Sequence, residues 1–263
     1  MMSDKNILFF DIDGTLLSHT THSIPESAII AIKKAKEKGH LIFINTGRPF
    51  SLIDECIKAL KPDGYVCGCG TYIRYHDEVL FSYSIPLKRC LEIKDLIRKT
   101  NVDGALESKN TIYFDNNIRN PFLDSLKQRY ITNNFTMSNF DDPMLSFDKF
   151  CIWFDELSDI TYFKKAIEND FDYISRAKDF GEIVPKGYSK ATGIQFLLNY
   201  FDIDINNTYA FGDSFNDEAM LSFVKNAIVM KNSDPELYKL ASFVTKDIDD
   251  NGIYYAMKHF NLI

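Results

Sequence analysis

The chain has 263 residues, of which 45% are hydrophobic and 25% charged, and its formal net charge is −7. This length allows one large domain, or one medium domain that carries a smaller one, and the composition is that of an ordinary globular protein. This negative charge argues against nucleic acid as the main partner, because binding to a duplex requires a basic face.

Apolar stretches are short throughout the chain. The run near the N-terminus, Ile7 to Phe10, is far shorter than a signal-peptide core, and no run approaches the length of a membrane span. The five cysteines are an odd number without a paired zinc-binding pattern, so we expect free thiols in a reducing compartment. We therefore expect a cytoplasmic protein with no membrane partner, either a monomer or a weak homodimer.

The first elements predict a βαβ unit. Ile7 to Phe10 is typical of a strand buried on both faces. Ser23 to Glu26 predicts a capping box at the start of a helix, which Gly39 ends. Leu41 to Ile44 is a second buried strand. This order implies a parallel sheet with a right-handed crossover.

The middle of the chain has a different pattern. After a helix expected from Pro49 to Leu60, a short strand at 65–67 and a hairpin at 71–85, polar and Asn-rich loops separate short elements. The elements expected here are helices at 87–99 and 119–130 and strands at 104–107, 111–115, 150–154, 171–175 and 181–184.

The first pattern then resumes. A helix is expected at 189–200, buried strands at 208–211, 227–230 and 242–245, and a closing helix at 252–260. We therefore predict an α/β fold, in which a Rossmann-like parallel-sheet core (residues 1–83 and 186–263) carries an inserted α+β cap domain (residues 84–185).

Polar turns follow three of the predicted buried strands. Asp11 and Asp13 follow the first strand, Thr46 the second, and Asp213 the strand at 208–211. Turns at the carboxyl ends of parallel strands line one crevice, where ligands bind. These residues are therefore candidates for one site, and Lys190 opens the helix that precedes the strand leading to Asp213.

Carboxylates clustered at a sheet edge repel one another unless a cation is present. As a few hard oxygen ligands they suit Mg²⁺, whose shell water and a substrate phosphate would complete. A carboxylate such as Asp11 can also attack phosphorus, and Asp13 could protonate the leaving oxygen and later activate water. Thr46 and Lys190 would hold the phosphoryl oxygens.

Each of these motifs, taken alone, could also occur for reasons unrelated to a phosphate site. Asp11 to Gly14 could be a plain turn or a calcium loop, but its glycine stands at the fourth position rather than the sixth, and no Glu closes it. Thr46 to Arg48 is a common turn, and Lys190 alone would be a solvated lysine. Their order and their positions after the expected elements favour a functional site over a chance combination.

The motifs resemble those of a known family. Asp11 to Thr15, Thr46 to Arg48, Lys190, and Gly212 to Asp217 are similar to the four motifs of the haloacid dehalogenase superfamily. The insert resembles the type C2 cap of the Cof-like sugar-phosphatase group (subclass IIB). The resemblance extends over essentially the whole chain, although it is strong only at the motifs.

The resemblance implies a role for each motif residue. Asp11 would be the nucleophile, which forms an aspartyl phosphate, and Asp13 the general acid and base. Mg²⁺ would be bound by Asp11, by the backbone carbonyl of Asp13 and by Asp213, with Asp217 acting through water. The residues expected to bind the phosphoryl group or the substrate are Thr46, Gly47, Arg48, Lys190 and Asn216.

The function that we predict is a magnesium-dependent phosphatase, a hydrolase acting on a small phosphorylated metabolite such as a sugar or polyol phosphate. A phosphomutase with the same nucleophile is one alternative, although the short stretch from Leu17 to Pro25 leaves little room for the cap that mutases carry there. A protein that only binds phosphorylated metabolites is another alternative.

Other residues give weaker signals. Many members of the group carry Asn-Gly and Gly-Asn where this chain has Cys69-Gly70 and Lys231-Asn232. Glu182 and Lys186, near the return from the insert, are candidates for substrate selection. The remaining candidates favour structural roles: His19 and His22 as solvated loop residues, and Trp153 as a core residue.

Overall fold

The apolar runs of the sequence pair as parallel strands around β1 (Ile7–Phe10). In the computed structural model, which describes residues 5–263, β1 lies between β12 (Thr208–Gly212) and β2 (Leu41–Asn45) and pairs with both in parallel. The sheet has eight strands in the order β14-β13-β12-β1-β2-β3-β4-β5. Its other strands are β3 (Gly64–Cys67), β4 (Tyr72–Tyr75), β5 (Glu78–Ser82), β13 (Asn226–Val229) and β14 (Phe243–Val244).

Helices cover this sheet because the strands are apolar on both sides. The side chains of Phe9, Phe43 and Ala210 form an apolar cluster with α6 (Lys190–Phe201) and α7 (Glu218–Phe223). The remaining helices of this part are α1 (Glu26–Glu37), α2 (Glu55–Lys58) and α8 (Gly252–His259). A parallel sheet with helices is the α/β fold predicted from the sequence.

A second sheet forms within the insert. It has six strands in the order β10-β11-β9-β6-β7-β8, antiparallel except where β7 and β8 pair in parallel. The strands are β6 (Asp103–Glu107), β7 (Ile112–Phe114), β8 (Met137–Asn139), β9 (Lys149–Trp153), β10 (Phe171–Ala177) and β11 (Phe180–Pro185). Its helices are α3 (Leu87–Lys99), α4 (Pro121–Thr132) and α5 (Ile160–Ile167).

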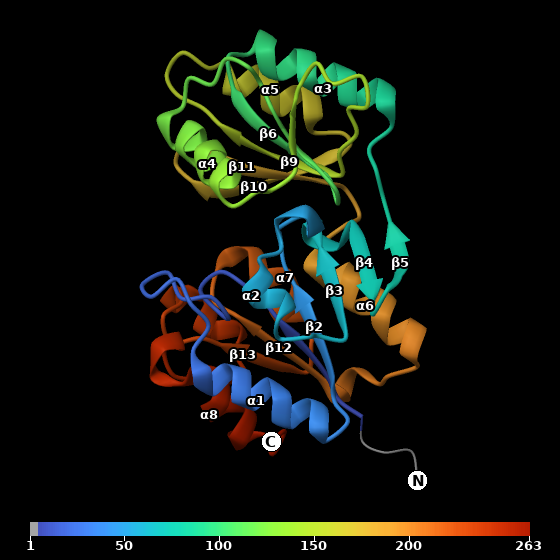
Figure 1. Cartoon of the computed structure of the whole chain (residues 1–263), viewed down its shortest axis with the longest axis vertical. Helices are drawn as coiled ribbons and strands as arrows, with labels where there is room; N and C mark the ends of the chain where they lie inside the picture. Colours follow the sequence, from blue (N-terminus) through green and yellow to red (C-terminus); the bar gives the residue numbers. More distant parts are fainter. Residues whose placement is uncertain (1–4) are drawn as a thin grey trace. The chain divides into compact units, whose positions relative to one another are not determined.

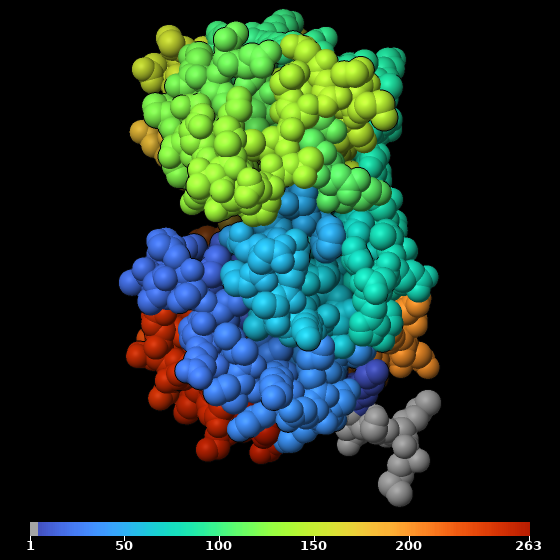
Figure 2. All heavy atoms as spheres, viewed as in Figure 1, coloured from blue at the N-terminus to red at the C-terminus, as the bar shows by residue number. Residues whose placement is uncertain are grey.

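The chain divides into two compact units (Figure 1). The first unit contains the described residues up to Gly47, together with Ile53–Phe81 and Ser189–Ile263. The second unit contains Ser82–Tyr188 and also the short segment Arg48–Leu52. In the space-filling view the green and yellow atoms of the insert gather in one body (Figure 2). The sequence analysis had placed Arg48–Leu52 in the core domain.

Two local predictions were wrong. The helix expected from Pro49 to Leu60 is broken, because Asp54 is extended (φ −64°, ψ 152°) between a 3-10 turn, Phe50–Leu52, and the short α2. The chain passes from the second unit back to the first at this point. The expected capping box is also absent: α1 begins after Pro25, with no side-chain cap.

The sequence analysis missed two elements of the insert. One is β8, which lies in the Asn-rich segment that we expected to be a loop, and the other is α5. Trp153 packs in the core of the second unit and stacks on Phe180, as its pattern favoured. Within residues 5–263, no helix combines the length and the apolar character needed to cross a bilayer.

Candidate active site

Asp11 lies where β1 ends and is 3% exposed. Its backbone N–H donates to the carbonyl of Phe211 on β12, which fixes the start of the turn. The turn then closes on itself, because Leu16 and Leu17 both donate their N–H to the carbonyl of Ile12. The backbone on both sides of the Asp11 side chain is thus fixed.

Gly14 brings this turn against Asp213. It has a φ of +85°, and a Cβ at this position would lie 2.2 Å from Oδ2 of Asp213. Only glycine combines this φ with so close an approach. The next residue, Thr15, donates its hydroxyl to Oδ1 of Asp213 at 2.6 Å. The first motif therefore orients the aspartate of the last motif.

Lys190 connects the motifs. It is the first residue of α6, is 1% exposed, and follows Ser189, which forms a capping box with Thr192. Its Nζ donates to Oδ1 of Asp11 and to Oδ1 of Asp217, both at 2.6 Å. A buried ammonium between two carboxylates satisfies a charge that would otherwise be costly to bury.

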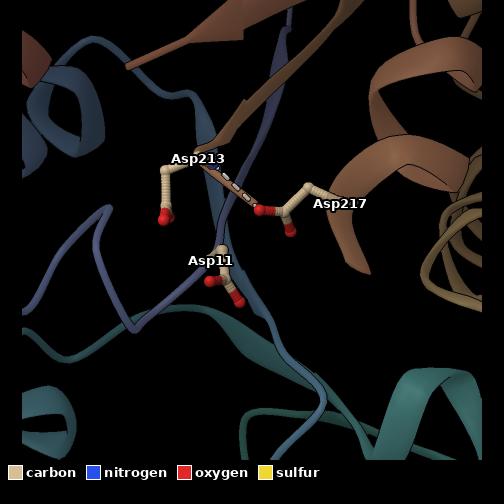
Figure 3. Close-up of side chains that lie close together, drawn as sticks. All are labelled: Asp11, Asp213 and Asp217. Carbon is tan, nitrogen blue, oxygen red and sulfur yellow. Dashed lines mark hydrogen bonds between the residues drawn. The ribbon is translucent and has the colours of Figure 1, made fainter. Parts of the chain in front are cut away.

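Asp217 is fully buried and uses both of its oxygens. Oδ1 accepts from Lys190, and Oδ2 accepts from the backbone N–H groups of Asp213 (2.9 Å) and Ser214 (3.1 Å). Figure 3 shows its carboxylate bonded to the Asp213 backbone, with Asp11 nearby. Asp217 therefore positions both Lys190 and Asp213. Asn216 accepts a hydrogen bond from Ser214 in the same turn.

Burial and charge crowding raise the pKa of two of these aspartates. Burial, followed by the charge of Asp217, raises the pKa of Asp11 to about 7, although Lys190 opposes the shift. Burial, followed by the charge of Asp11, raises the pKa of Asp213 to about 8. Burial alone would lower the pKa of Lys190, but the two carboxylates beside it raise it. The cluster carries more negative charge than one lysine offsets.

This donor set suits a hard cation. One carboxylate oxygen from each of Asp11, Asp213 and Asp217 lies within 4.8 Å of the other two. Carboxylates are ligands of Mg²⁺, and a cation would relieve the repulsion that raises the pKa values. Asp11 and Asp213 are better placed as ligands than Asp217, whose oxygens already accept three hydrogen bonds.

The other predicted residues lie around this cluster or in the second unit. Thr46 follows β2, beside β1 in the sheet, and is 1% exposed. Gly47 follows it and is half-buried, as is Asp13 in the turn after Asp11. Arg48 belongs to the second unit, where it donates to the carbonyl of Leu52.

Asn45 has a place in the site that the sequence analysis did not give it. Its side chain is completely buried at the end of β2, and its Nδ2 donates to the backbone carbonyl of Lys190 at 3.0 Å. Its Oδ1 is buried without a hydrogen-bond partner. The sequence did contain a signal for this role: Asn45 is a polar residue at the end of a strand that is otherwise apolar. A buried polar side chain is normally hydrogen-bonded, so a specific partner could have been expected.

The two segments that differ from the family pattern, Cys69-Gly70 and Lys231-Asn232, both contact the motifs. Cys69 has a φ of +54°, a conformation that Asn adopts more readily, and its N–H donates to the carbonyl of Thr46. Asn232 donates to the carbonyl of Gly14 and accepts from the N–H of Ile248. Asn232 therefore ties the first turn to the C-terminal segment.

Residues 8–257 match the model of a family described as haloacid dehalogenase-like hydrolase. The protein YkrA of Bacillus subtilis (strain 168), a phosphatase by name, is 30% identical over 263 residues, which are 99% of either chain. The pyridoxal phosphate phosphatase YbhA of Escherichia coli (strain K12) is 24% identical over 92% of this chain and 93% of its own.

A solved structure with the same fold is that of the sugar phosphatase BT4131, of subclass IIB of this superfamily. It is 29% identical, with a TM-score of 0.85 over 98% of this chain and all of that one. The chain belongs to the haloacid dehalogenase-like hydrolases. The fold class, the family and the enzyme class predicted from the sequence, a phosphatase, are thereby confirmed.

Proposed function

We propose that the chain hydrolyses the phosphate monoester of a small hydroxylated metabolite, with Asp11 as the nucleophile and Mg²⁺ as the cofactor. The observation that carries this proposal is the ion pair between Lys190 Nζ and Oδ1 of Asp11. It fixes one carboxylate oxygen and leaves Oδ2 outside the pair. A buried, oriented carboxylate beside a cation is what attack on phosphorus requires.

The proposed reaction has two steps, both at Asp11. In the first, Oδ2 of Asp11 bonds to phosphorus as the ester P–O bond breaks, and Asp13 gives its proton to the leaving oxygen. In the second, Asp13 removes a proton from water as that water attacks the aspartyl phosphate, which releases phosphate and restores Asp11. Thr46 and Lys190 would offset the charge on the phosphoryl oxygens.

Mg²⁺ would be held by Asp11, Asp213 and the backbone carbonyl of Asp13, and it would neutralise charge on the phosphoryl group during transfer. Asp217 would act by holding Asp213 and Lys190 in place. Gly47 and Asn216 would border the phosphoryl group. These assignments rest on the hydrogen bonds of Asp217 and on the close approach of the three carboxylates.

Substrate choice is proposed to depend on the second unit, acting as an inserted cap domain. Two relatives support a small phosphorylated metabolite: one is named a sugar phosphatase and the other a pyridoxal phosphate phosphatase. We favour a sugar or polyol phosphate. The five cysteines are all free thiols, which supports a reducing, cytoplasmic setting.

The test is release of phosphate from sugar, polyol, nucleotide and vitamin phosphates, in Mg²⁺ and in chelator. Asp11→Asn should abolish release, because the amide cannot form the acyl phosphate. Asp77→Asn is the matched control, since Asp77 is fully exposed and pairs only with Arg74 among the ion pairs of the described residues.

Wild-type activity in Asp11→Asn would disprove the nucleophile. Equal phosphate release in Mg²⁺ and in chelator would show that Mg²⁺ is not required as a cofactor. Isomerised sugar phosphate with little free phosphate would identify a mutase instead.

A further inference from the structure

The helix α6, which carries Lys190, begins beside the strand β3 and the turn that follows it. β3 pairs with β2 so that Val66 lies opposite Asn45. After β3 the chain forms a tight turn, Gly68–Gly70, whose three residues all have a positive φ (+58°, +54° and +91°). Consecutive left-handed residues are unusual, which makes this turn a specific feature of the chain. All these elements belong to the first unit.

This segment holds the backbone of Thr46 from both directions. The N–H of Thr46 donates to the carbonyl of Val66 at 2.9 Å, and the carbonyl of Thr46 accepts from the N–H of Cys69 at 3.2 Å. The hydroxyl of Thr71 donates to the carbonyl of Gly68 at 3.0 Å, which closes the turn. The position of Thr46, a proposed ligand of the phosphoryl oxygens, is therefore set by β3 and the turn.

Gly70 brings the same turn against the start of α6. A Cβ at this position would lie 2.4 Å from the backbone oxygen of Ser189, well inside the ~3.3 Å at which a carbon and a carbonyl oxygen meet. Ser189 caps α6, and Lys190 is the next residue. The lack of a side chain at Gly70 thus determines how closely the turn approaches the residue before Lys190.

Gly193 makes a second close contact, one turn further along α6. A Cβ here would lie 2.4 Å from Cγ1 of Val66, whose own Cβ would be 3.5 Å away. Both residues are buried. Glycine destabilises the interior of a helix relative to alanine, so local helix propensity does not explain this residue. The close packing of α6 against β3 does.

Val66 consequently links the two groups that would hold the phosphoryl oxygens. Its carbonyl fixes Thr46, and its side chain limits the approach of the first turn of α6. Lys190, in that turn, has to reach Oδ1 of Asp11 and Oδ1 of Asp217, each at 2.6 Å. A shift of α6 away from β3 would therefore move Lys190 relative to both Thr46 and Asp11.

We propose that Gly70 and Gly193 are positioning residues for the phosphoryl transfer; this inference rests on the proposed function. Without side chains, they let α6 pack so closely that Lys190 and Thr46 act on the same phosphoryl group. Neither glycine has a side chain that could contact the substrate. A displacement of about 1 Å in a catalytic group can cost about a hundredfold in rate, so kcat should depend on this packing.

The first test compares Gly70→Ala with Gly39→Ala. Gly39 has nearly the same backbone conformation (φ +87°), but a Cβ there would meet no heavy atom within 4 Å among the described residues, apart from its neighbours in the chain. Both variants should melt at lower temperature, because alanine is strained at this φ. Only Gly70→Ala should lose kcat, by about tenfold to a hundredfold, with little change in KM.

The second test exchanges size between α6 and β3. Gly193→Ala should lower kcat to a similar extent, because its methyl group would overlap with Val66. Adding Val66→Ala removes Cγ1 and leaves the two Cβ atoms at an ordinary contact distance of 3.5 Å. The double variant should therefore recover most of the lost kcat. Kinetics would use the ester that the wild type hydrolyses fastest, with p-nitrophenyl phosphate added to the panel above.

Equal values of kcat in Gly70→Ala and Gly39→Ala would overturn the role of Gly70. A double variant no faster than Gly193→Ala, or a Gly193→Ala protein as fast as the wild type, would overturn that of Gly193. If Gly70→Ala does not fold, the exchange between Gly193 and Val66 still decides. A wild type that releases phosphate from no ester would disprove the proposed function, and this inference with it. An active wild type with unaffected glycine variants would disprove this inference alone.

Discussion

Each unit buries a lysine between two carboxylates, but the two clusters are built differently. Lys190 lies between Asp11 and Asp217, and Lys149 lies between Glu107 and Glu182. Both lysines are 1% exposed. The first cluster uses short side chains in turns, where backbone N–H groups are available as donors. The second uses long side chains on strands, whose backbone groups pair with the neighbouring strands.

The clusters also differ in charge. Around Lys190 a third carboxylate, that of Asp213, lies within 4.8 Å of the other two, so negative charge is in excess. Around Lys149 two carboxylates share one ammonium. The first cluster thus has two negative charges in excess when all three carboxylates are ionised, and a divalent cation would offset them; the second has one in excess.

The largest effect is expected from breaking the first cluster at its lysine. Lys190→Met should lower kcat by about a thousandfold on every ester, because the charge that orients Asp11 and faces the phosphoryl group is gone. Lys149→Met is the counterpart in the second unit; it leaves two buried carboxylates without their cation, so it should lower the melting temperature rather than kcat. Steady-state kinetics and thermal melts of both variants would measure the two effects. A Lys149→Met protein that loses kcat as Lys190→Met does would remove the distinction between the clusters.

The difference in charge gives a second prediction, on stability. The folded-state pKa values of Asp11 and Asp213, about 7 and about 8, lie above the usual 3.8. Between these limits the folded state holds protons that the unfolded state has lost, so without a divalent cation stability should fall as the pH rises from about 4 to about 8. Added Mg²⁺ should restore it at the upper end.

Thermal melts of the wild type and of Asp213→Asn, with chelator and with Mg²⁺, would measure this effect. Asn cannot ionise and can still accept from Thr15, so the variant should melt several degrees higher than the wild type at pH 8 in chelator and gain little from Mg²⁺. The difference in melting temperature between the two proteins reports on the Asp11–Asp213 pair, because all other titrating groups are the same in both. If the melting temperature of the wild type at pH 8 does not change when Mg²⁺ is added, the cluster of Asp11, Asp213 and Asp217 does not bind the cation.

The sequence was sufficient to predict the first cluster because its signals are local. Asp11, Thr46 and Asp213 each follow an apolar run, and parallel strands bring such turns to one edge. The second cluster could not be predicted in this way. Glu107 and Lys149 are 42 residues apart, and they meet only because β6 and β9 pair in one particular antiparallel register. Of its members, only Glu182 had been named as a candidate.

The errors in the fold have similar causes. The apolar pattern from Pro49 to Leu60 is helical, but Leu52 packs with the apolar cluster of the second unit whereas Ile57 belongs to the first. A segment that serves two units cannot remain one helix, and Asp54 breaks it. In β8 the strand is short and polar, so pairing with β7 outweighs its weak propensity.

The smallest expected effect concerns how the first cluster is held in place. Asn45 donates to the backbone carbonyl of Lys190 and leaves Oδ1 without a partner. Asn45→Ala should lower kcat by about tenfold with little change in KM, because losing one buried hydrogen bond loosens Lys190 without removing it. Ser27→Ala is the matched control, since the Ser27 hydroxyl on α1 is also buried without a partner. If both variants lower the melting temperature but neither changes kcat, Asn45 only stabilises the fold. A loss of kcat confined to Asn45→Ala would show that the position of Lys190, and not its charge alone, limits the reaction.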